Sequence, residues 1–197
     1  MLCAGFINYS KIRDSLYIKL FLIFIAYSLL TEISAFIIGV LLRINTFPIF
    51  NTWNLVNHFF YLFFFLHLLQ NSLKRKIVIF IIGIYAVFTA VVIAFYVDFL
   101  TKFLSINSVI GSILIVISIM IYFSELLQSD EILNLKKSIY FWISLGVLLF
   151  NIGFIPVYII AEFIVFGGVF KIITFLLNLL MISCFVTGFI VSKKEYN

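Results

Sequence analysis

The chain has 197 residues, of which 65% are hydrophobic and only 11% are charged, and its mean hydropathy is +1.28. A water-soluble core of this size cannot hide that much apolar surface, so the composition excludes a soluble globular protein and favours one that uses lipid as solvent. The 13 basic residues, which give a net charge of +5, are spread in twos and threes, a pattern that indicates anionic lipid headgroups and no nucleic-acid partner.

Six apolar segments are each long enough to cross a membrane as a helix. The hydrocarbon layer is about 30 Å thick, so a spanning helix needs about 20 mainly apolar residues. The segments are continuous apolar runs, which favours helices over the alternating strands of an outer-membrane barrel. The predicted spans are 16–42, 53–72, 77–97, 105–127, 139–161 and 170–191. The sequence therefore predicts an all-α fold, a single polytopic transmembrane helical bundle over residues 1–197.

The basic residues predict how the chain is threaded, because short loops retain them on the cytoplasmic side. Ten of the 13 fall in the N-terminal segment, the second and fourth connections and the C-terminal segment. Arg43, Lys102 and Lys171 fall on the other side. Both termini are therefore predicted to be cytoplasmic. No signal-peptide cleavage site precedes the first span, which we expect to be retained.

Glu32 is the outstanding polar residue of the first span. Ionisable groups at membrane depth are costly and are default functional candidates. Glu32 lies about ten residues, or about 15 Å, from the outer end of its helix, and it shares a face with Ser28, Ala35 and Gly39. Two interpretations stay open, a ligand-binding or proton-linked carboxylate and a protonated side chain that only hydrogen-bonds a neighbouring helix.

The second span opens with a polar stripe. Asn54, Asn57, His58 and Tyr61 share one face of a helix that enters from the outside. His67 lies nine residues from His58, about half a turn away, so the two imidazoles cannot share a ligand on this helix. No spacing of Cys or His elsewhere suits a metal or a disulfide. We therefore predict neither a metal nor a cofactor.

Asn151 and Asn178 place further polar groups in the fifth and sixth spans, where an interhelical hydrogen bond worth about 0.6 kcal/mol is the alternative interpretation. These polar groups fall at the midplane or in the outer half, whereas the inner halves of the second and third spans are apolar. We predict one polar pocket open to the outside, without a continuous conduit. Its ligand-binding or proton-linked residues are Glu32, Asn57, His58, Tyr61, Asn151 and Asn178, with Glu162 at the rim.

The cytoplasmic connection from Glu125 to Lys137 is the most charged segment of the chain. It is interpreted either as a solvated link between helices or as a docking strip for a cytoplasmic or membrane signalling partner such as a kinase. The candidate docking residues are Asp130, Glu131, Lys136 and Lys137.

The segments 133–156 (LNLKKSIYFWISLGVLLFNIGFIP) and 178–193 (NLLMISCFVTGFIVSK) resemble an uncharacterised family of small multi-pass bacterial membrane proteins. The layout is also similar to the membrane-embedded sensor regions attached to bacterial histidine kinases. The resemblance implies a location in the bacterial inner membrane and a sensing or adaptor role, and it supplies no catalytic residues.

These patterns together predict a sensory or signalling-adaptor module with an outward-facing polar pocket, which is not an enzyme. No connection exceeds about a dozen residues, and no catalytic or nucleotide-binding motif is present. One alternative is a small transporter or transporter subunit that couples protons through Glu32. Another is an intramembrane lipid-modifying enzyme with Glu32 and His58 as acid and base. The lipid bilayer is the certain partner, and the oligomeric state is left open.

Overall fold

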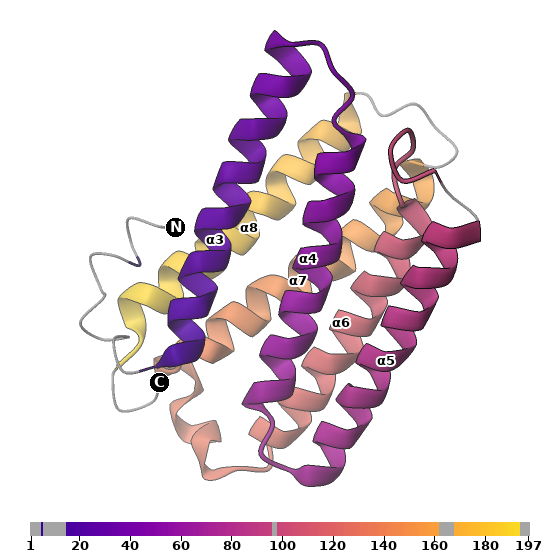
Figure 1. Cartoon of the computed structure of the whole chain (residues 1–197). Coiled ribbons are helices and arrows are strands. Elements are labelled where there is room, and N and C mark those ends of the chain that lie inside the picture. The colour runs from indigo at the N-terminus through magenta and orange to yellow at the C-terminus, as the bar shows by residue number, and fades with distance from the viewer. Residues whose placement is uncertain (1–4, 6–14, 96–97, 162–167, 194–197) are drawn as a thin grey trace.

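The computed structural model describes residues 5, 15–95, 98–161 and 168–193. In this part of the chain every regular element is a helix, which confirms the prediction of an all-α fold (Figure 1). The elements are α3 (Leu16–Phe36), its π-helical continuation η1 (Ile37–Leu41), α4 (Phe47–Leu68), α5 (Ser72–Phe95), α6 (Ser105–Leu126), the 3-10 segment η2 (Asp130–Lys137), α7 (Ile139–Ala161) and α8 (Val169–Val191).

Local hydrogen bonds to asparagine side chains accompany the starts of α4 and α5, which lie before the predicted spans. Asn45 Oδ1 accepts a hydrogen bond from Phe47 N at 2.9 Å, and Pro48 occupies the first turn of α4. Asn71 Oδ1 accepts a hydrogen bond from Leu73 N at 2.9 Å at the start of α5. These helices begin six and five residues before the predicted spans, because hydropathy marks the residues that suit lipid, whereas a helix can extend beyond them.

The helices form two groups that cross (Figure 1). α4, α5 and α6 run side by side, while α7 and α8 pass obliquely behind them, with α3 packed against α4. α6 joins the groups because it contacts both α4 and α7. α4 consequently lies inside the bundle, in contact with α3, α5 and α6.

The connections gather at the two ends of the bundle. We call one end the basic end, which holds the connections 69–71 and 127–138, the start of α3 and the end of α8. The far end holds the connections 42–46 and 98–104. Seven of the ten Lys and Arg residues in the described part of the chain lie in or beside the basic end.

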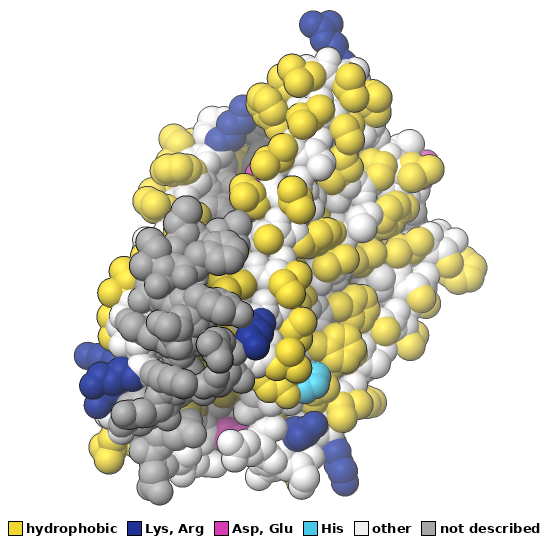
Figure 2. Space-filling model, turned by 60° about the vertical axis from the view of Figure 1, so that its left-hand side comes forward, with side chains coloured by type: hydrophobic (Ala, Val, Ile, Leu, Met, Phe, Trp, Pro, Cys, Tyr) yellow, Lys and Arg dark blue, Asp and Glu magenta, His cyan; other side chains and the backbone are white. Residues whose placement is uncertain are grey.

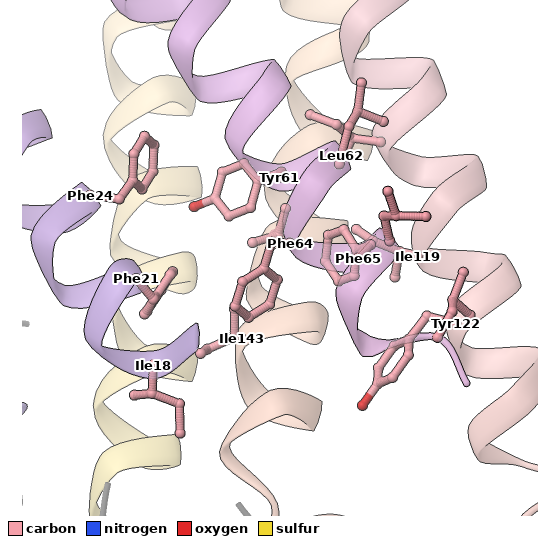
Figure 3. Close-up of a cluster of buried hydrophobic side chains, with 14 of the residues drawn as sticks. Ile18, Phe21, Phe24, Tyr61, Leu62, Phe64, Phe65, Ile119, Tyr122 and Ile143 are labelled. Carbon is pink, nitrogen blue, oxygen red and sulfur yellow. The ribbon is translucent and has the colours of Figure 1, made fainter. Parts of the chain in front are cut away.

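A core of aromatic and aliphatic side chains closes the half of the bundle nearest the basic end (Figure 3). Phe24 of α3 stacks on Phe60 of α4, with ring centroids 4.0 Å apart, and Phe21 meets Phe185 of α8 edge to face at 5.1 Å. Phe65 of α4 is fully buried near Tyr122 of α6. The fully buried members of this core are Ile18, Phe21, Leu62, Phe65, Val78, Tyr85, Ile115, Ile119, Ile139, Ile143, Val147 and Phe189.

The outer surface is that of a protein in lipid. Figure 2 shows hydrophobic side chains covering most of the described surface of one face, with Lys and Arg largely toward its ends. Large apolar side chains are freely exposed, such as Phe80 at 68%, Phe95 at 80% and Phe175 at 65%. Among the described residues, five helices are long and apolar enough to cross a membrane. These are Leu16–Leu41, Ser72–Phe95, Ser105–Leu126, Ile139–Ile160 and Val169–Val191. The chain is therefore a multi-pass membrane protein.

α4, which covers the second predicted span, is as long as the others but does not belong to this apolar set. Three asparagines and two histidines lower its hydropathy. Asn51, Asn54 and His58 are nonetheless at most 2% exposed, because the neighbouring helices cover them. Burial in protein, rather than contact with lipid, thus accommodates the polar side of this helix.

Candidate functional site

A buried network of polar side chains joins α4, α5 and α6 in the half of the bundle nearest the far end. We call it the α4–α6 polar cluster; it consists of Asn54, His58, Tyr85, Thr89, Asn107 and Ser108. Asn54 Nδ2 donates to Ser108 Oγ, and that hydroxyl donates to Leu104 O at 2.8 Å. His58 Nδ1 donates to Asn54 O at 2.7 Å, since a carbonyl oxygen can only accept.

Asn107 connects α6 with α5. Its Oδ1 accepts from Thr89 Oγ1 at 2.8 Å, and its Nδ2 donates to Tyr85 OH at 2.9 Å. Asn107 itself is fully buried. One amide thereby satisfies two hydroxyl groups of a neighbouring helix, and such bonds between helices stabilise bundles in lipid, where no water competes for the partners.

His58 packs against the backbone of α6 at Gly111. A Cβ atom built on Gly111 would lie 2.7 Å from Cγ and from Nε2 of His58. The imidazole is 1% exposed, and its ring centroid lies 5.6 Å from that of Tyr85. Only a glycine at position 111 leaves room for the ring, so this contact fixes how closely α4 and α6 approach.

The cluster is suited to holding helices together. Its polar groups are bonded to one another or to main chain, although Asn54 Oδ1 is buried without a hydrogen-bond partner in the described structure. Among the described residues, no group of three or more His, Cys, Asp or Glu side chains is placed to hold a metal. The arrangement offers hydrogen bonds rather than an activated nucleophile.

Sequence reasoning missed Tyr85, Thr89 and Asn107 as members of this cluster. Tyr85 and Thr89 are four residues apart and share a face of α5, a spacing that could have marked them. Asn107 lies near the start of a predicted span, where polar residues are common, so the sequence pattern does not single it out. Their pairing depends on how α5 and α6 are rotated, which the sequence pattern does not state.

The predicted residues of α4 are divided between two environments. His58 belongs to the α4–α6 polar cluster, and Asn57 beside it is also buried. Tyr61 lies instead in the aromatic core, with its ring 5.5 Å from Phe24 and 5.6 Å from Phe60 (Figure 3).

The remaining predicted residues lie elsewhere. Asn151 donates to Val147 O at 2.8 Å on its own helix α7, and Asn178 donates to Thr174 O at 2.9 Å on its own helix α8. Glu32 is exposed on α3. Glu162, the predicted rim residue, lies outside the described residues.

The structure therefore does not form the predicted common pocket. Glu32 has no hydrogen-bond or ion-pair partner within the described part of the chain, whereas His58 is enclosed between α4 and α6. The prediction that these two residues face one cavity finds no support among the described contacts, because membrane depth was known from the sequence but the rotation of each helix was not. Whether any of the six predicted residues binds a ligand or a proton stays a prediction.

A groove does open between α3 and α4 toward the far end of the bundle. This α3–α4 groove has a volume of about 430 Å³. Its lining residues are Tyr27, Leu30, Thr31, Ser34, Pro48, Ile49 and Thr52. The Thr31 and Thr52 hydroxyls already donate to carbonyls of their own helices, at 3.0 and 2.7 Å. The groove is thus mainly apolar, with hydroxyl oxygens left as hydrogen-bond acceptors.

Trp53 of α4 closes the lower side of this groove. Its Nε1 donates to Ser28 Oγ of α3 at 3.2 Å, and Ser28 Oγ donates to Phe24 O at 3.0 Å. Below this bridge the stacked rings of Phe24 and Phe60 begin the aromatic core. The groove therefore ends at a hydrogen-bonded tryptophan rather than continuing along the two helices.

At the far end, Asn51 of α4 fastens the connection between α5 and α6. Its Nδ2 donates to Phe99 O at 2.9 Å and to Lys102 O at 2.8 Å, and its Oδ1 accepts from Leu104 N at 3.0 Å. In the same connection Asp98 Oδ1 accepts from Leu100 N at 3.0 Å. This hydrogen bond, followed by one from Thr101, lowers the pKa of Asp98 below its ordinary value.

At the basic end, Glu125 of α6 holds the connection between α4 and α5. Its Oε1 accepts from Gln70 N at 2.7 Å and from Asn71 N at 3.2 Å. Glu125 therefore has a structural role that the docking interpretation of this segment did not include.

The predicted docking residues lie in η2, next to this contact. Lys136 is exposed, and its carbonyl accepts from Trp142 Nε1 at 2.9 Å. Lys137 Nζ donates to Asn134 Oδ1 at 2.7 Å. Asp130 and Glu131 belong to η2 by their backbone, and their side chains lie outside what the structure describes. Docking by these four residues stays a prediction.

Comparisons of the chain with protein-family models, with curated proteins and with solved structures found no match in any of the three.

Proposed function

We propose that the protein is a sensory or signalling-adaptor module of the bacterial inner membrane, with its ligand site in the α3–α4 groove. The observation that carries this proposal is the contrast between the two halves of the same helix pair. α3 and α4 are open to a ligand toward the far end and closed by stacked aromatic rings toward the basic end. A site that is open on one side suits detection better than permeation.

The lining of the groove indicates the class of ligand. Leu30, Pro48 and Ile49 supply apolar walls, and the hydroxyls of Thr31 and Ser34 add weak hydrogen-bonding capacity. Ligand sites of this size are mostly apolar with a few polar groups that fix orientation. We propose an acyl chain or a similarly apolar small molecule as the ligand.

We further propose six spans with both termini in the cytoplasm, which places the basic end inside. Ten of the 13 Lys and Arg residues support this sidedness. The burial of Asn51, Asn54 and His58 by neighbouring helices supports α4 as a span despite its hydropathy. A polar helix crosses a membrane when protein rather than lipid surrounds its polar face.

A route from the groove to the basic end supports the adaptor role. α3 lines the groove with its outer half, and at its base Ser15 Oγ lies 2.6 Å from Tyr140 OH of α7. η2 directly precedes α7, and Lys137 O in η2 accepts from Lys193 N at 3.0 Å. A ligand that moves α3 would therefore disturb η2, where Asp130, Glu131, Lys136 and Lys137 are proposed to meet a partner such as a kinase.

Ligand binding is tested with Trp53 as the reporter. The chain has two tryptophans, so Trp142→Phe leaves Trp53 alone, beside the groove. We expect a brominated fatty acid, added at low mole fraction to phosphatidylcholine vesicles, to quench Trp53 in a saturable manner. The groove-filling change Ser34→Phe is expected to abolish saturation. Quenching that rises linearly and equally in both proteins would contradict the proposed site.

Signal output is tested at η2 in the same vesicles. Leu133 is 86% exposed, so Leu133→Cys accepts an environment-sensitive fluorophore without loss of packing, once Cys3 and Cys184 are replaced. A sensor predicts a spectral change at position 133 that follows the occupancy of the groove. Occupancy without such a change would contradict a signalling role.

The transporter alternative is favoured by the position of Glu32, which is exposed on α3 between the exposed apolar side chains of Leu29 and Ile33. A carboxylate that faces lipid or water at this depth could carry a proton. Proton flux into buffered vesicles that is abolished by Glu32→Gln would favour this alternative. The lipid-enzyme alternative has no such support, because Glu32 and His58 are apart.

A further inference from the structure

One face of α3 is buried near the basic end and bare near the far end. Ile18, Ile25 and Glu32 follow one another at intervals of seven residues and therefore share this face. Ile18 is 0% and Ile25 is 6% exposed, whereas Glu32 and its neighbour Phe36 are exposed. This face, which we call the packing seam of α3, is therefore buried in its inner part and exposed in its outer part.

The bare part of the seam is apolar except for one carboxyl group. Leu29 is 50%, Ile33 is 48% and Phe36 is 60% exposed, and all three flank Glu32. None of them lines the α3–α4 groove, which lies on another side of the helix. An acidic side chain amid such residues is costly in lipid unless a positive or hydrogen-bonding group covers it.

We infer that the Glu32 face of α3 docks a transmembrane helix of another protein that carries an Arg or Lys at the depth of Glu32. An apolar seam with a single carboxyl group matches a helix with an apolar face and a single cation, because pairing removes the cost of both charges. This inference rests on the proposed adaptor role and names the chemistry of its membrane partner.

The charge distribution of the chain argues against a second copy as the occupant. Every described Lys and Arg lies near a helix end or in a connection, for example Lys19, Arg43 and Lys171. Two copies that pair symmetrically through this face in the same orientation would bring one Glu32 carboxyl toward the other, which supplies a like charge rather than a cation. Lipid likewise carries its cationic headgroups at the interface and not at this depth.

The test uses designed single-span peptides and the full chain in phosphatidylcholine–phosphatidylglycerol vesicles. The peptides are Leu/Ala-rich helices that carry a dansyl group and either Arg, Lys or Leu at the depth of Glu32. Energy transfer from Trp53 in the Trp142→Phe background reports association, because Trp53 contacts α3. We expect the Arg and Lys peptides to bind about tenfold more tightly than to a Glu32→Gln variant. The Leu peptide is expected to bind both proteins equally.

A matched control moves the carboxyl group to another exposed position. Val87 of α5 is 67% exposed, so the double variant Glu32→Gln, Val87→Glu keeps one acidic side chain on the lipid surface but removes it from α3. We expect this variant to behave like Glu32→Gln in the Trp53 assay. Because position 32 is exposed, Glu32→Gln should retain the circular dichroism and unfolding temperature of the parent chain.

Three results would overturn the inference. The first is equal binding of the Arg peptide to the parent chain and to Glu32→Gln, and the second is equal binding of the Arg and Leu peptides. The third is Glu32-dependent association of two labelled copies of the chain, which would make a second copy the occupant. Ligand binding with no peptide association defeats this inference alone, and peptide association with no response at position 133 defeats the sensing proposal alone.

Discussion

At the scale of the residue, lipid offers no hydrogen-bond partners, so the polar side chains of this protein bond to other protein groups. Asn107 bonds Thr89 and Tyr85 across two helices, whereas Asn151 and Asn178 bond carbonyls of their own helices. The first kind of bond fixes the relative rotation of two helices, and the second only satisfies the amide. The same residue type therefore has different consequences that depend on its neighbours.

Gly111 is predicted to be required for the contact between α4 and α6. In Gly111→Ala the new methyl group meets the His58 ring, which is 1% exposed and has no room to move, so we expect destabilisation of about 1–3 kcal/mol. Unfolding by denaturant in detergent micelles measures this change. Gly83→Ala is the matched control, because a Cβ at position 83 meets nothing within 4 Å. Equal stability of the two variants would show that the contact between His58 and position 111 accommodates an added methyl group.

Asp98 is predicted to make its turn sensitive to acid. Its pKa lies below the ordinary value of 3.8, chiefly because Leu100 N donates to the carboxylate, so the charged form stabilises the folded turn. That contribution is fully present above pH 3.8 and is lost as the pH falls through the lower pKa of the folded state. The amide chemical shift of Leu100, followed by NMR below pH 3.8, should show the transition. The shift should stay constant in Asp98→Asn, and a transition that survives in this variant would assign it to another group.

At the scale of the element, α4 shows why hydropathy and position in the bundle need to be considered together. Its asparagines and histidines lower its hydropathy, yet α3, α5 and α6 cover most of its polar face. α8 is the opposite case, since only 6% of its most apolar stretch is buried. A central helix tolerates polar residues that a peripheral helix would expose to lipid.

Asn51 is predicted to hold the far-end connection between α5 and α6. Asn51→Ala removes two donors and one acceptor that serve buried main-chain groups, and we expect a loss of about 1–3 kcal/mol in the free energy of unfolding. Hydrogen exchange at Leu104 N should accelerate at the same time.

Thr52→Ala is the neighbouring control for this prediction. The Thr52 hydroxyl is exposed and donates only to Pro48 O of its own helix, at 2.7 Å. We expect little change in stability or in exchange at Leu104. If the two variants behave alike, the three hydrogen bonds of Asn51 do not determine the order of the connection.

At the scale of the whole molecule, the bundle is packed by an aromatic core in the half nearest the basic end, whereas α3 and α4 separate in the other half. The aromatic core joins α3, α4, α6, α7 and α8 near the basic end. Toward the far end α3 and α4 separate around a groove of about 430 Å³, and the Glu32 face of α3 is left bare. Both proposals, a ligand in the groove and a partner helix on α3, follow from this asymmetry.

The threading of the chain is predicted to place the basic end in the cytoplasm. Reporter fusions after residues 75, 133 and 197 should be active as cytoplasmic fusions, and those after 48, 102 and 167 as external ones. The fusion after residue 75 decides the status of α4, because a helix that does not cross would leave positions 48 and 75 on the same side. An external C-terminus would overturn the six-span topology.

The sequence by itself determined the class of the molecule and the extent of four of its helices. Continuous apolar runs specify α3, α6, α7 and α8 to within a few residues, because lipid requires a helix of a set length wherever the chain crosses. The start of α4 at Phe47 was not predicted, since it coincides with a local hydrogen bond from Phe47 N to Asn45 Oδ1 and with Pro48 rather than with a rise in hydropathy.

Only the tertiary structure decided which polar residues meet. Sequence gives the depth of Glu32, His58 and Asn107 in the bundle, but each helix is free to rotate about its axis until its neighbours pack. The contact of His58 with Gly111 fixes that rotation for α4, and it directs the imidazole toward α6. Contacts between helices therefore decide where a site forms, because the energy that selects a rotation comes from neighbours distant in the chain.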